Sequence, residues 1–373
     1  MAGGNNSGKT SLFQGFAVWE FCRTLVEAEK GRIAFTPGQK FQGIGISERE
    51  FLPINLPDLS HLWTNLRAQK SAADANGYTL RIKCGWVDAG VDRHLEFGLA
   101  LANDRLFVKV TDTNLSVANK VPRIAYLPPF AGISSREEHL PRALRKRRIG
   151  EGLAGSVIRN SILEMYSANT EKRKILRGAK SKISDVDLKG LRLNDQWELV
   201  QQSLRQVFGA ELVVSPFNDE YHSYIDVQVV KGELTGYKLV RFPGFNARDL
   251  MVEGSGFLQW LSVFSLAADR DVDVLLLDEP DAHLHTSLQR ELFRQVQDVA
   301  SDKTVLVATH SPEVLRWASP EQILGFKKSS PPKYLKDEDG KIGLIAGIGR
   351  VIPPFLAVAK SGAMQLSLAS ASG

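Results

Sequence analysis

The segment "GGNNSGKTS", residues 3–11, is the part of the chain from which its fold is most directly inferred. Gly3, Gly8, Lys9 and Thr10 fit the pattern G-x-x-x-x-G-K-[ST], in which glycines let the backbone wrap an anion. Apolar residues at helical spacing follow Thr10 as far as about Glu29, so the loop opens directly into a helix whose N-terminus favours negative charge. The segment therefore predicts a phosphate-binding loop. Its residues are Gly3, Gly4, Asn5, Asn6, Ser7, Gly8, Lys9, Thr10 and Ser11.

Only Met1 and Ala2 precede this loop, whereas such a loop normally follows a buried, central strand. We expect that no such strand forms from these residues. Ordering a glycine-rich loop costs about 1–2 kcal/mol per residue in backbone entropy, so an unanchored loop would bind its ligand weakly. This also leads us to expect that a fuller form of the protein carries an apolar strand upstream of Gly3.

Two further segments read as buried strands that end in reactive side chains. "VLLLDEP", residues 274–280, ends in Asp278 and Glu279, and "TVLVATH", residues 304–310, ends in His310. In parallel sheets ligands bind at the carboxyl ends of the strands. We expect Asp278 and Thr10 to bind Mg²⁺ and Glu279 to polarise an attacking water as the general base. His310 is expected at the same sheet edge, where it would contact a γ-phosphate or orient the water.

A second anion site is predicted at "EGSGFLQW", residues 253–260. Gly254, Ser255 and Gly256 stand directly before an apolar helix that runs to Ala268. Backbone amides and a serine hydroxyl at a helix N-terminus can satisfy its unpaired N–H groups or bind an anion. We expect Ser255 to cap this helix.

Together these four elements resemble the ABC-type ATPase heads of the SMC, RecF and OLD families. "GGNNSGKTS" looks like their Walker A loop, "EGSGFLQW" like a divergent signature motif, "LLLDEPDAHLH" like Walker B with the D-loop, and "ATHSPEVL" like the switch-histidine region. The resemblance covers about residues 3–29 and 240–326. Gln39 and Gln42 are candidates for the family's Q-loop glutamine.

This resemblance implies binding and hydrolysis of Mg·ATP. In these families the signature serine of one head contacts ATP held by the other head, which would make Ser255 act in trans within an ATP-dependent homodimer. The resemblance also implies coupling to DNA or to a separate nuclease or effector chain, in genome maintenance or in defence against foreign DNA. A Toprim nuclease domain, which OLD proteins carry after the head, is not indicated, and "KYLKDEDGK" reads as a charged loop.

The sequence predicts an α/β fold of the P-loop NTPase class, with an ABC-type head, a small antiparallel β lobe and a helical insertion. Residues 1–130 would form the first part of the ATPase lobe, with the Walker A loop and the β lobe. Residues 131–210 would form the insertion, residues 211–330 the second part with signature, Walker B and switch histidine, and residues 331–373 a tail. Strands are expected near residues 78–84, 94–101 and 105–111.

Charge is unevenly distributed. The segment from Arg136 to Lys182 holds 13 Lys and Arg against 5 Asp and Glu, in a chain whose formal net charge is +5. Such a segment either attracts DNA or is a solvated helical arm, and the sequence leaves both open. The two cysteines, Cys22 and Cys84, show no partner pattern, and no apolar run reaches the ~18 residues of a membrane span. A cytoplasmic setting is expected.

Two other classes of protein remain as alternatives. One is the ATP-binding subunit of a transporter, against which the long insertion and the basic segment argue. The other is a truncated, non-catalytic nucleotide-binding scaffold, which the missing upstream strand favours. The intact set of Lys9, Thr10, Asp278 and Glu279 favours hydrolysis instead.

Overall fold

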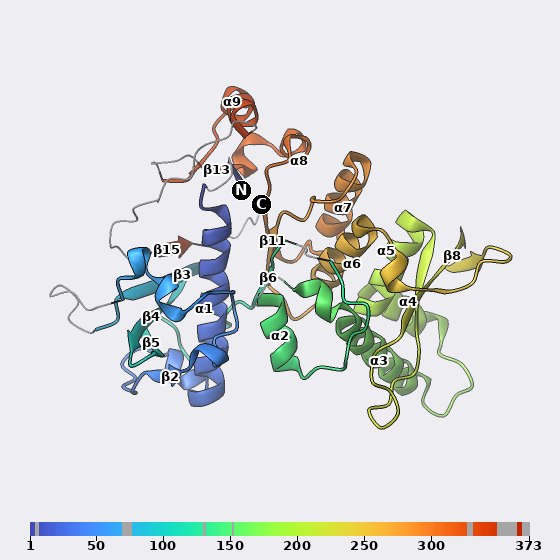
Figure 1. The fold of residues 1–373 in the computed structure, drawn as a ribbon, viewed down its shortest axis with the longest axis horizontal. Coiled ribbons are helices and arrows are strands. Elements are labelled where there is room, and N and C mark those ends of the chain that lie inside the picture. The colour runs from blue at the N-terminus through green and yellow to red at the C-terminus, as the bar shows by residue number, and fades with distance from the viewer. Residues whose placement is uncertain are drawn as a thin grey trace. The chain divides into compact units, whose positions relative to one another are not determined.

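The computed structural model describes residues 1–3, 7–68, 77–129, 132–150, 153–326, 331–348 and 364–367 (Figure 1). The chain divides into two compact units, Met1–Tyr126 with Leu306–Gly373 and Leu127–Val305. It passes from one unit to the other within β6 (Ile124–Leu127) and again within β12 (Thr304–Ala308). Among the helices in these ranges, none is long and apolar enough to cross a membrane.

The first unit is built on helix α1 (Lys9–Lys30) and a five-stranded sheet of order β15-β3-β4-β5-β2. Trp19 of α1 is 1% exposed, and its indole Nε1 donates a hydrogen bond to the carbonyl of Leu95 at 2.9 Å. This contact fixes the helix on the sheet, and the predicted helix and three strands of the β lobe are confirmed. The strands are β2 (Ile44–Ile46), β3 (Leu80–Asp88), β4 (Val91–Ala102), β5 (Arg105–Thr113) and β15 (Met364–Ser367).

A second sheet of the first unit corrects the expectation that no strand precedes the phosphate loop. Ala2–Gly3 forms β1, which pairs in parallel with β13 (Leu324–Phe326). Ala2 is wholly buried in an apolar cluster with Leu315, Ile323 and Leu344. Two residues are enough to form this strand because the neighbouring segments present backbone N–H and C=O groups to it. Leaving such groups buried without hydrogen-bond partners would cost free energy.

The carboxy-terminal part of the first unit also differs from the expected tail. The sheet that holds β1 continues with β14 (Lys333–Tyr334), antiparallel to β13, and α9 (Glu338–Ile348) covers the same core. β15 runs parallel to β3, with Met364 opposite Ile82. The charged loop predicted at 333–341 is thus a strand followed by a helix start, and residues 364–367 are a strand. An exposed strand edge pairs readily with a short extended segment, whatever its composition.

The second unit consists of helices around a small antiparallel sheet of order β10-β8-β7, with β9 paired to the far half of β8. The predicted helical insertion, the apolar helix that ends near Ala268 and the buried strand that leads into Asp278 are confirmed. The strands are β7 (Ala210–Val214), β8 (Val227–Thr235), β9 (Lys238–Arg241), β10 (Arg248–Asp249) and β11 (Val274–Asp278). The helices are α2 (Arg142–Gly150), α3 (Ile158–Arg177), α4 (Asp185–Asn194), α5 (Gln196–Phe208), α6 (Ser255–Ala267) and α7 (Thr286–Val299).

Helix α6 lies at the centre of this unit, because most of its side chains are buried and they point to nearly all sides of the helix. The indole Nε1 of Trp260 donates to the hydroxyl of Ser203 on α5 at 2.9 Å. That hydroxyl in turn donates to Oε1 of Gln295 on α7 at 2.6 Å. This buried chain of hydrogen bonds ties three helices together and fixes the direction in which α6 presents its N-terminus.

Candidate nucleotide-binding site

Gly3 and Gly8 of the phosphate loop are required for different structural reasons. Gly8 is the N-cap of α1 and has φ 95°, a left-handed conformation that only glycine adopts without strain. A Cβ on Gly3 would lie 2.5 Å from the carbonyl oxygen of Phe326 on the neighbouring strand, so only glycine fits. Gly3 is thus required by a tight contact with a neighbouring strand and Gly8 by its position as a helix cap.

Lys9 is the charged centre of this loop. It is 6% exposed, and its Nζ donates hydrogen bonds to the carbonyl of Gly3 at 2.8 Å and to Oγ of Ser7 at 3.4 Å. Thr10 and Ser11 are exposed in the first turn of α1, where the helix dipole favours an anion. The predicted loop residues Gly4, Asn5 and Asn6 lie outside the described residues.

His310 lies beside the phosphate loop within the first unit. Ala2 forms a parallel bridge with Thr309, whose N–H donates to the carbonyl of Met1 at 3.1 Å. His310 directly follows Thr309 and is exposed. The α-amino group of Met1 is buried here, and burial, together with repulsion from the Lys9 ammonium, lowers its pKa to about 5. The structure thus places His310 next to the residue that pairs with β1, a neighbour that the sequence did not predict.

The signature segment lies in the second unit at the start of α6. Gly254 holds the N-cap position, and Ser255 is the first helical residue. No side chain caps this helix, so the predicted serine cap is wrong: Ser255 sits one position too late, and its side chain is exposed. Gly254 and Ser255 are both exposed at this helix start.

Lys231 on β8 supports the signature segment, although no motif or periodic pattern in the sequence points to it. Its Nζ lies 2.7 Å from Oε2 of Glu253 and 5.3 Å from the centroid of the Phe257 ring. The ion pair and the cation–π contact hold the residues on either side of the glycine–serine–glycine turn. Lys231 thus fixes the turn without belonging to it.

The Walker B strand and the loop after it also lie in the second unit, together with the signature segment. All five residues of β11 are buried, and Asp278 is 2% exposed. Glu279 is half-buried and has φ 51°, a strained conformation for a residue with a side chain. Such outliers gather at functional sites, which agrees with the role predicted for Glu279.

The loop after Glu279 contacts the signature helix directly. Nε2 of Gln259 donates to the carbonyl of Pro280 at 3.2 Å, and a Cβ on Gly256 would lie 3.1 Å from the carbonyl oxygen of His283. The signature glycine thus allows the D-loop to approach α6. The structure places the predicted residues in two groups, one around Lys9 and His310 in the first unit and one around Ser255 and Glu279 in the second.

The Q-loop candidates remain predictions. Gln39 and Gln42 are both exposed in the segment that precedes β2. Gln42 lines a surface hollow of about 540 Å³ with Lys40, Phe41, Tyr78 and Phe107.

The sequence profile of the family described as "AAA domain, putative AbiEii toxin, Type IV TA system" matches residues 133–316. This range includes the signature segment, Walker B and His310. No curated protein sequence matches the chain. Among solved structures, it resembles an Smc head domain with a coiled coil and joint from Pyrococcus yayanosii, with 14% identity and a TM-score of 0.31, over 55% of this chain and 36% of that one. It also resembles an SmcHead bound to the C-winged helix domain of ScpA, with 11% identity and a TM-score of 0.37, over 82% and 80% of the two chains.

Three features define the class of protein to which this fold belongs. They are the phosphate loop with its buried lysine, the signature, Walker B and switch segments in that order along the chain, and the match to the AAA-domain family. The chain has the α/β fold of P-loop ATPases of the ABC type, and its residues 133–316 match the AAA-domain family. The Pyrococcus yayanosii chain is much longer, and this chain spans 36% of its length.

Proposed function

We propose that the protein binds and hydrolyses Mg·ATP as a homodimer and couples this cycle to DNA or to a separate nuclease or effector chain. The observation that carries the proposal is the phosphate loop itself, with Lys9 buried at the start of α1 and His310 beside its strand. A genome-maintenance or anti-phage defence role is the setting that the family resemblance favours.

The residues fit the nucleotide and its metal by their chemistry. Gly8, with φ 95° at the N-cap of α1, turns the backbone into a helix N-terminus that favours an anion, and the ammonium of Lys9 supplies charge. The hydroxyl of Thr10 and the carboxylate of Asp278 are oxygen ligands of the kind that Mg²⁺ takes. When bound, Mg²⁺ would neutralise charge that develops on the phosphates.

Within this proposal each side chain has one task. Glu279 polarises the water that attacks the γ-phosphate, a contribution typically worth about 10²–10⁴-fold in rate. His310 contacts the γ-phosphate or orients that water. Ser255 meets ATP held by the other copy, which its exposure at an uncapped helix N-terminus supports.

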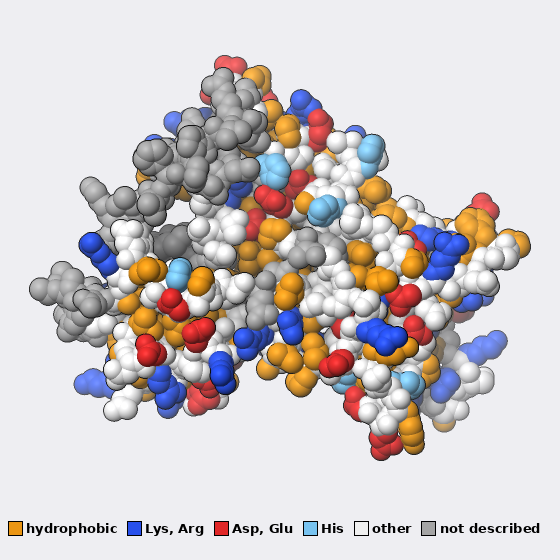
Figure 2. All heavy atoms as spheres, in the orientation of Figure 1, with side chains coloured by type: hydrophobic (Ala, Val, Ile, Leu, Met, Phe, Trp, Pro, Cys, Tyr) orange, Lys and Arg blue, Asp and Glu red, His pale blue; other side chains and the backbone are white. Residues whose placement is uncertain are grey.

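DNA coupling is proposed through the basic segment 136–182, which forms α2 and α3. Part of its charge is used inside the protein: Arg159 is 1% exposed and pairs with Asp249, and Arg145 pairs with Glu164 at 2.6 Å. On the face drawn in Figure 2, Lys and Arg side chains are interspersed with Asp, Glu and apolar ones. A localised site within the segment therefore suits DNA better than a broad positive face.

The test is the Glu279→Gln variant, with Glu233→Gln as the matched control because Glu233 is exposed on β8. Glu279→Gln should keep ATP affinity, lose about 10²–10⁴-fold in turnover, and accumulate an ATP-bound dimer. Glu233→Gln should retain turnover. ATP binding by calorimetry, phosphate release and mass by light scattering measure these outcomes. Turnover at the unmodified rate in Glu279→Gln would exclude Glu279 as the general base, and no ATP binding by the unmodified protein would exclude the function.

A further inference from the structure

A groove in the second unit lies between α3, α5 and β7, and its volume is about 680 Å³. It is separate from the residues assigned above to ATP. Five basic side chains line it, against two acidic ones, Glu198 and Glu211. The basic residues are Arg173, Lys174, Arg177, Arg205 and Arg241. A hollow with this excess of positive charge is suited to an anion that carries more than one charge.

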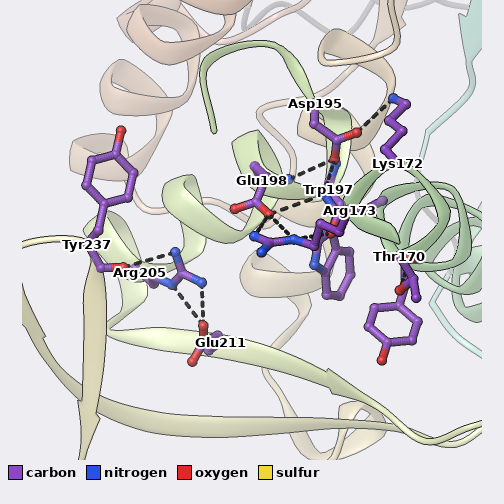
Figure 3. Close-up of polar contacts among 11 residues, drawn as sticks. Thr170, Lys172, Arg173, Asp195, Trp197, Glu198, Arg205, Glu211 and Tyr237 are labelled. Atoms are coloured by element: carbon purple, nitrogen blue, oxygen red, sulfur yellow. Dashed lines mark hydrogen bonds and ion pairs between the residues drawn. The ribbon is translucent and has the colours of Figure 1, made fainter. Parts of the chain in front are cut away.

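Both acidic side chains are already neutralised by arginines of the groove (Figure 3). Glu198 is 7% exposed and accepts hydrogen bonds from the guanidinium of Arg173. Oε1 of Glu211 accepts a hydrogen bond from Nε of Arg205 at 3.0 Å. These carboxylates orient the two guanidinium groups. Nη1 of Arg205 also donates to the carbonyl of Tyr237, and the side chain of Arg205 is 13% exposed, whereas the 39% exposed Arg173 keeps N–H donors for a ligand. The acids thus position the cations and do not cancel the charge of the remaining three.

The other cations of the groove are available to a ligand. Arg177 and Arg241 are exposed and form no ion pair among the described residues. Lys174 has only a distant contact with Glu171, at 3.9 Å, and its side chain is 72% exposed. Arg173 and Arg177 are four residues apart on α3 and so lie on one face of the helix. The charge is therefore both concentrated and accessible.

The length of the groove favours a strand over a single nucleotide. Its α3 wall runs from Tyr166 to Arg177, which corresponds to about 16 Å at 1.5 Å per residue. That distance accommodates several successive phosphates. The half-buried ring of Tyr166 lines the groove and packs edge to face, at 5.4 Å, on the buried Trp197, so Tyr166 supplies the aromatic surface on which an unpaired base can stack.

We propose that this groove binds single-stranded nucleic acid through its phosphates. The proposal deepens the DNA coupling proposed above by assigning it a site, in which α3 of the basic segment acts together with α5, β7 and β9. Two of its cations, Arg205 and Arg241, lie outside residues 136–182, so the site is not defined by the charge run alone.

The experiment measures binding of a fluorescein-labelled 20-nucleotide single strand by anisotropy, over a range of salt concentrations and without ATP. The groove variant is Arg177→Glu with Arg241→Glu. The control is Lys189→Glu with Arg290→Glu, which makes the same change in charge at exposed residues of α4 and α7. The groove variant should bind at least about tenfold more weakly, with a salt slope smaller by about two, since each lost phosphate contact removes roughly one unit. The control should bind within about twofold of the unmodified protein.

Three results would overturn the proposal: equal losses in both variants, no loss in the groove variant, or binding of the duplex or of free dTMP that is as tight as binding of the strand. The variant Arg177→Gln with Arg241→Gln, which should show a smaller loss in the same direction, guards against effects of charge reversal on folding. Phosphate release without nucleic acid should be unchanged in the groove variant. If the unmodified protein releases no phosphate from ATP, that result contradicts the ATPase proposal and leaves the nucleic-acid proposal to be judged by the anisotropy measurements. The two proposals can therefore fail separately.

Discussion

At the scale of single residues, the phosphate loop depends on what surrounds its glycines. The sequence pattern explains Gly3 by the close approach of a phosphate. The structure adds a second constraint, which comes from Phe326 on the neighbouring strand β13. A Cβ there would also lie 2.9 Å from Cβ of Phe326. Residue 3 thus joins the strand pairing of the first unit to the ligand loop.

Replacing Gly3 by alanine should therefore impair both folding and nucleotide binding. Forcing an extra carbon against a neighbouring backbone typically costs about 1–3 kcal/mol, and separation of β1 from β13 would move the loop. We expect a lower melting temperature and at least about tenfold weaker ATP binding, measured by thermal melts and calorimetry. Gly190→Ala is the control because nothing lies within 4 Å of its added carbon, and it should be neutral or stabilising. Equal behaviour of both variants would contradict this account.

The same residues show what a sequence can and cannot predict. The helix after Gly8 follows from neighbours within a few positions, and it was predicted; the left-handed conformation of Gly8 itself is a finding of the structure. The strand at Ala2 depends on Phe326 and Thr309, more than 300 residues away, and no local pattern reports them. The strained φ of Glu279 fits its predicted role, but the sequence carries no signal for it.

At the scale of elements, a buried arginine connects the basic helix α3 to the segment that leads into the signature. Nη1 of Arg159 donates to the carbonyl of Ser134 at 2.7 Å, and Nη2 donates to Oδ1 of Asp249 at 2.7 Å. The same Oδ1 accepts the N–H of Met251 at 2.7 Å. Glu137 accepts the N–H of Arg159, and burial raises the pKa of Glu137 above its ordinary value. Asp249 therefore holds two elements in register.

The Asp249→Asn variant should lower the free energy of unfolding by about 1–3 kcal/mol. Breaking a fully buried pair typically costs about 3–5 kcal/mol, and the estimate is reduced because the side chain of Asp249 is 43% exposed. The control is Glu164→Gln, whose pair with Arg145 has a 56% exposed carboxylate and should contribute less than about 1 kcal/mol. Urea unfolding measures both. If Glu164→Gln lowers the free energy of unfolding more than Asp249→Asn does, the Arg159–Asp249 pair does not stabilise the protein as proposed.

Elements were predicted well where periodicity is local and poorly where pairing is distant. Helices α5, α6 and α7 and strand β11 have apolar patterns that are complete within their own length. β15 has only four residues, and its partner Ile82 lies far back in the chain. Lys231 looks like any lysine of a strand, and only the fold brings it to Glu253.

At the scale of the whole molecule, the proposed dimer makes one copy depend on another. The exposed Ser255 at an uncapped helix N-terminus belongs to a different unit from Lys9. If Ser255 acts on ATP held by a second copy, a defect in Lys9 and a defect in Ser255 affect different sites of the dimer. This separates a trans arrangement from a site completed within one chain.

Mixing two inactive variants tests that arrangement. Ser255→Arg places a bulky cation where the other copy's phosphate would lie, so it should bind ATP as a monomer but neither dimerise nor hydrolyse. Lys9→Ala should lose ATP binding itself. An equal mixture should recover at most one working site per dimer, read as phosphate release against each variant alone. A strictly monomeric Ser255→Arg protein that hydrolyses ATP would refute trans action.

The position of Lys9 has a consequence for how ATP enters. Its ammonium is already bonded to the carbonyl of Gly3 and to Oγ of Ser7, so it does not wait in open solvent for a phosphate. Nucleotide entry is therefore an exchange, in which phosphate oxygens replace acceptors that the protein supplies to itself. The affinity for ATP then reports the difference between these internal bonds of Lys9 and the bonds that replace them. If ATP binds as proposed, an incoming anion that cannot replace these two internal acceptors gains little from the lysine.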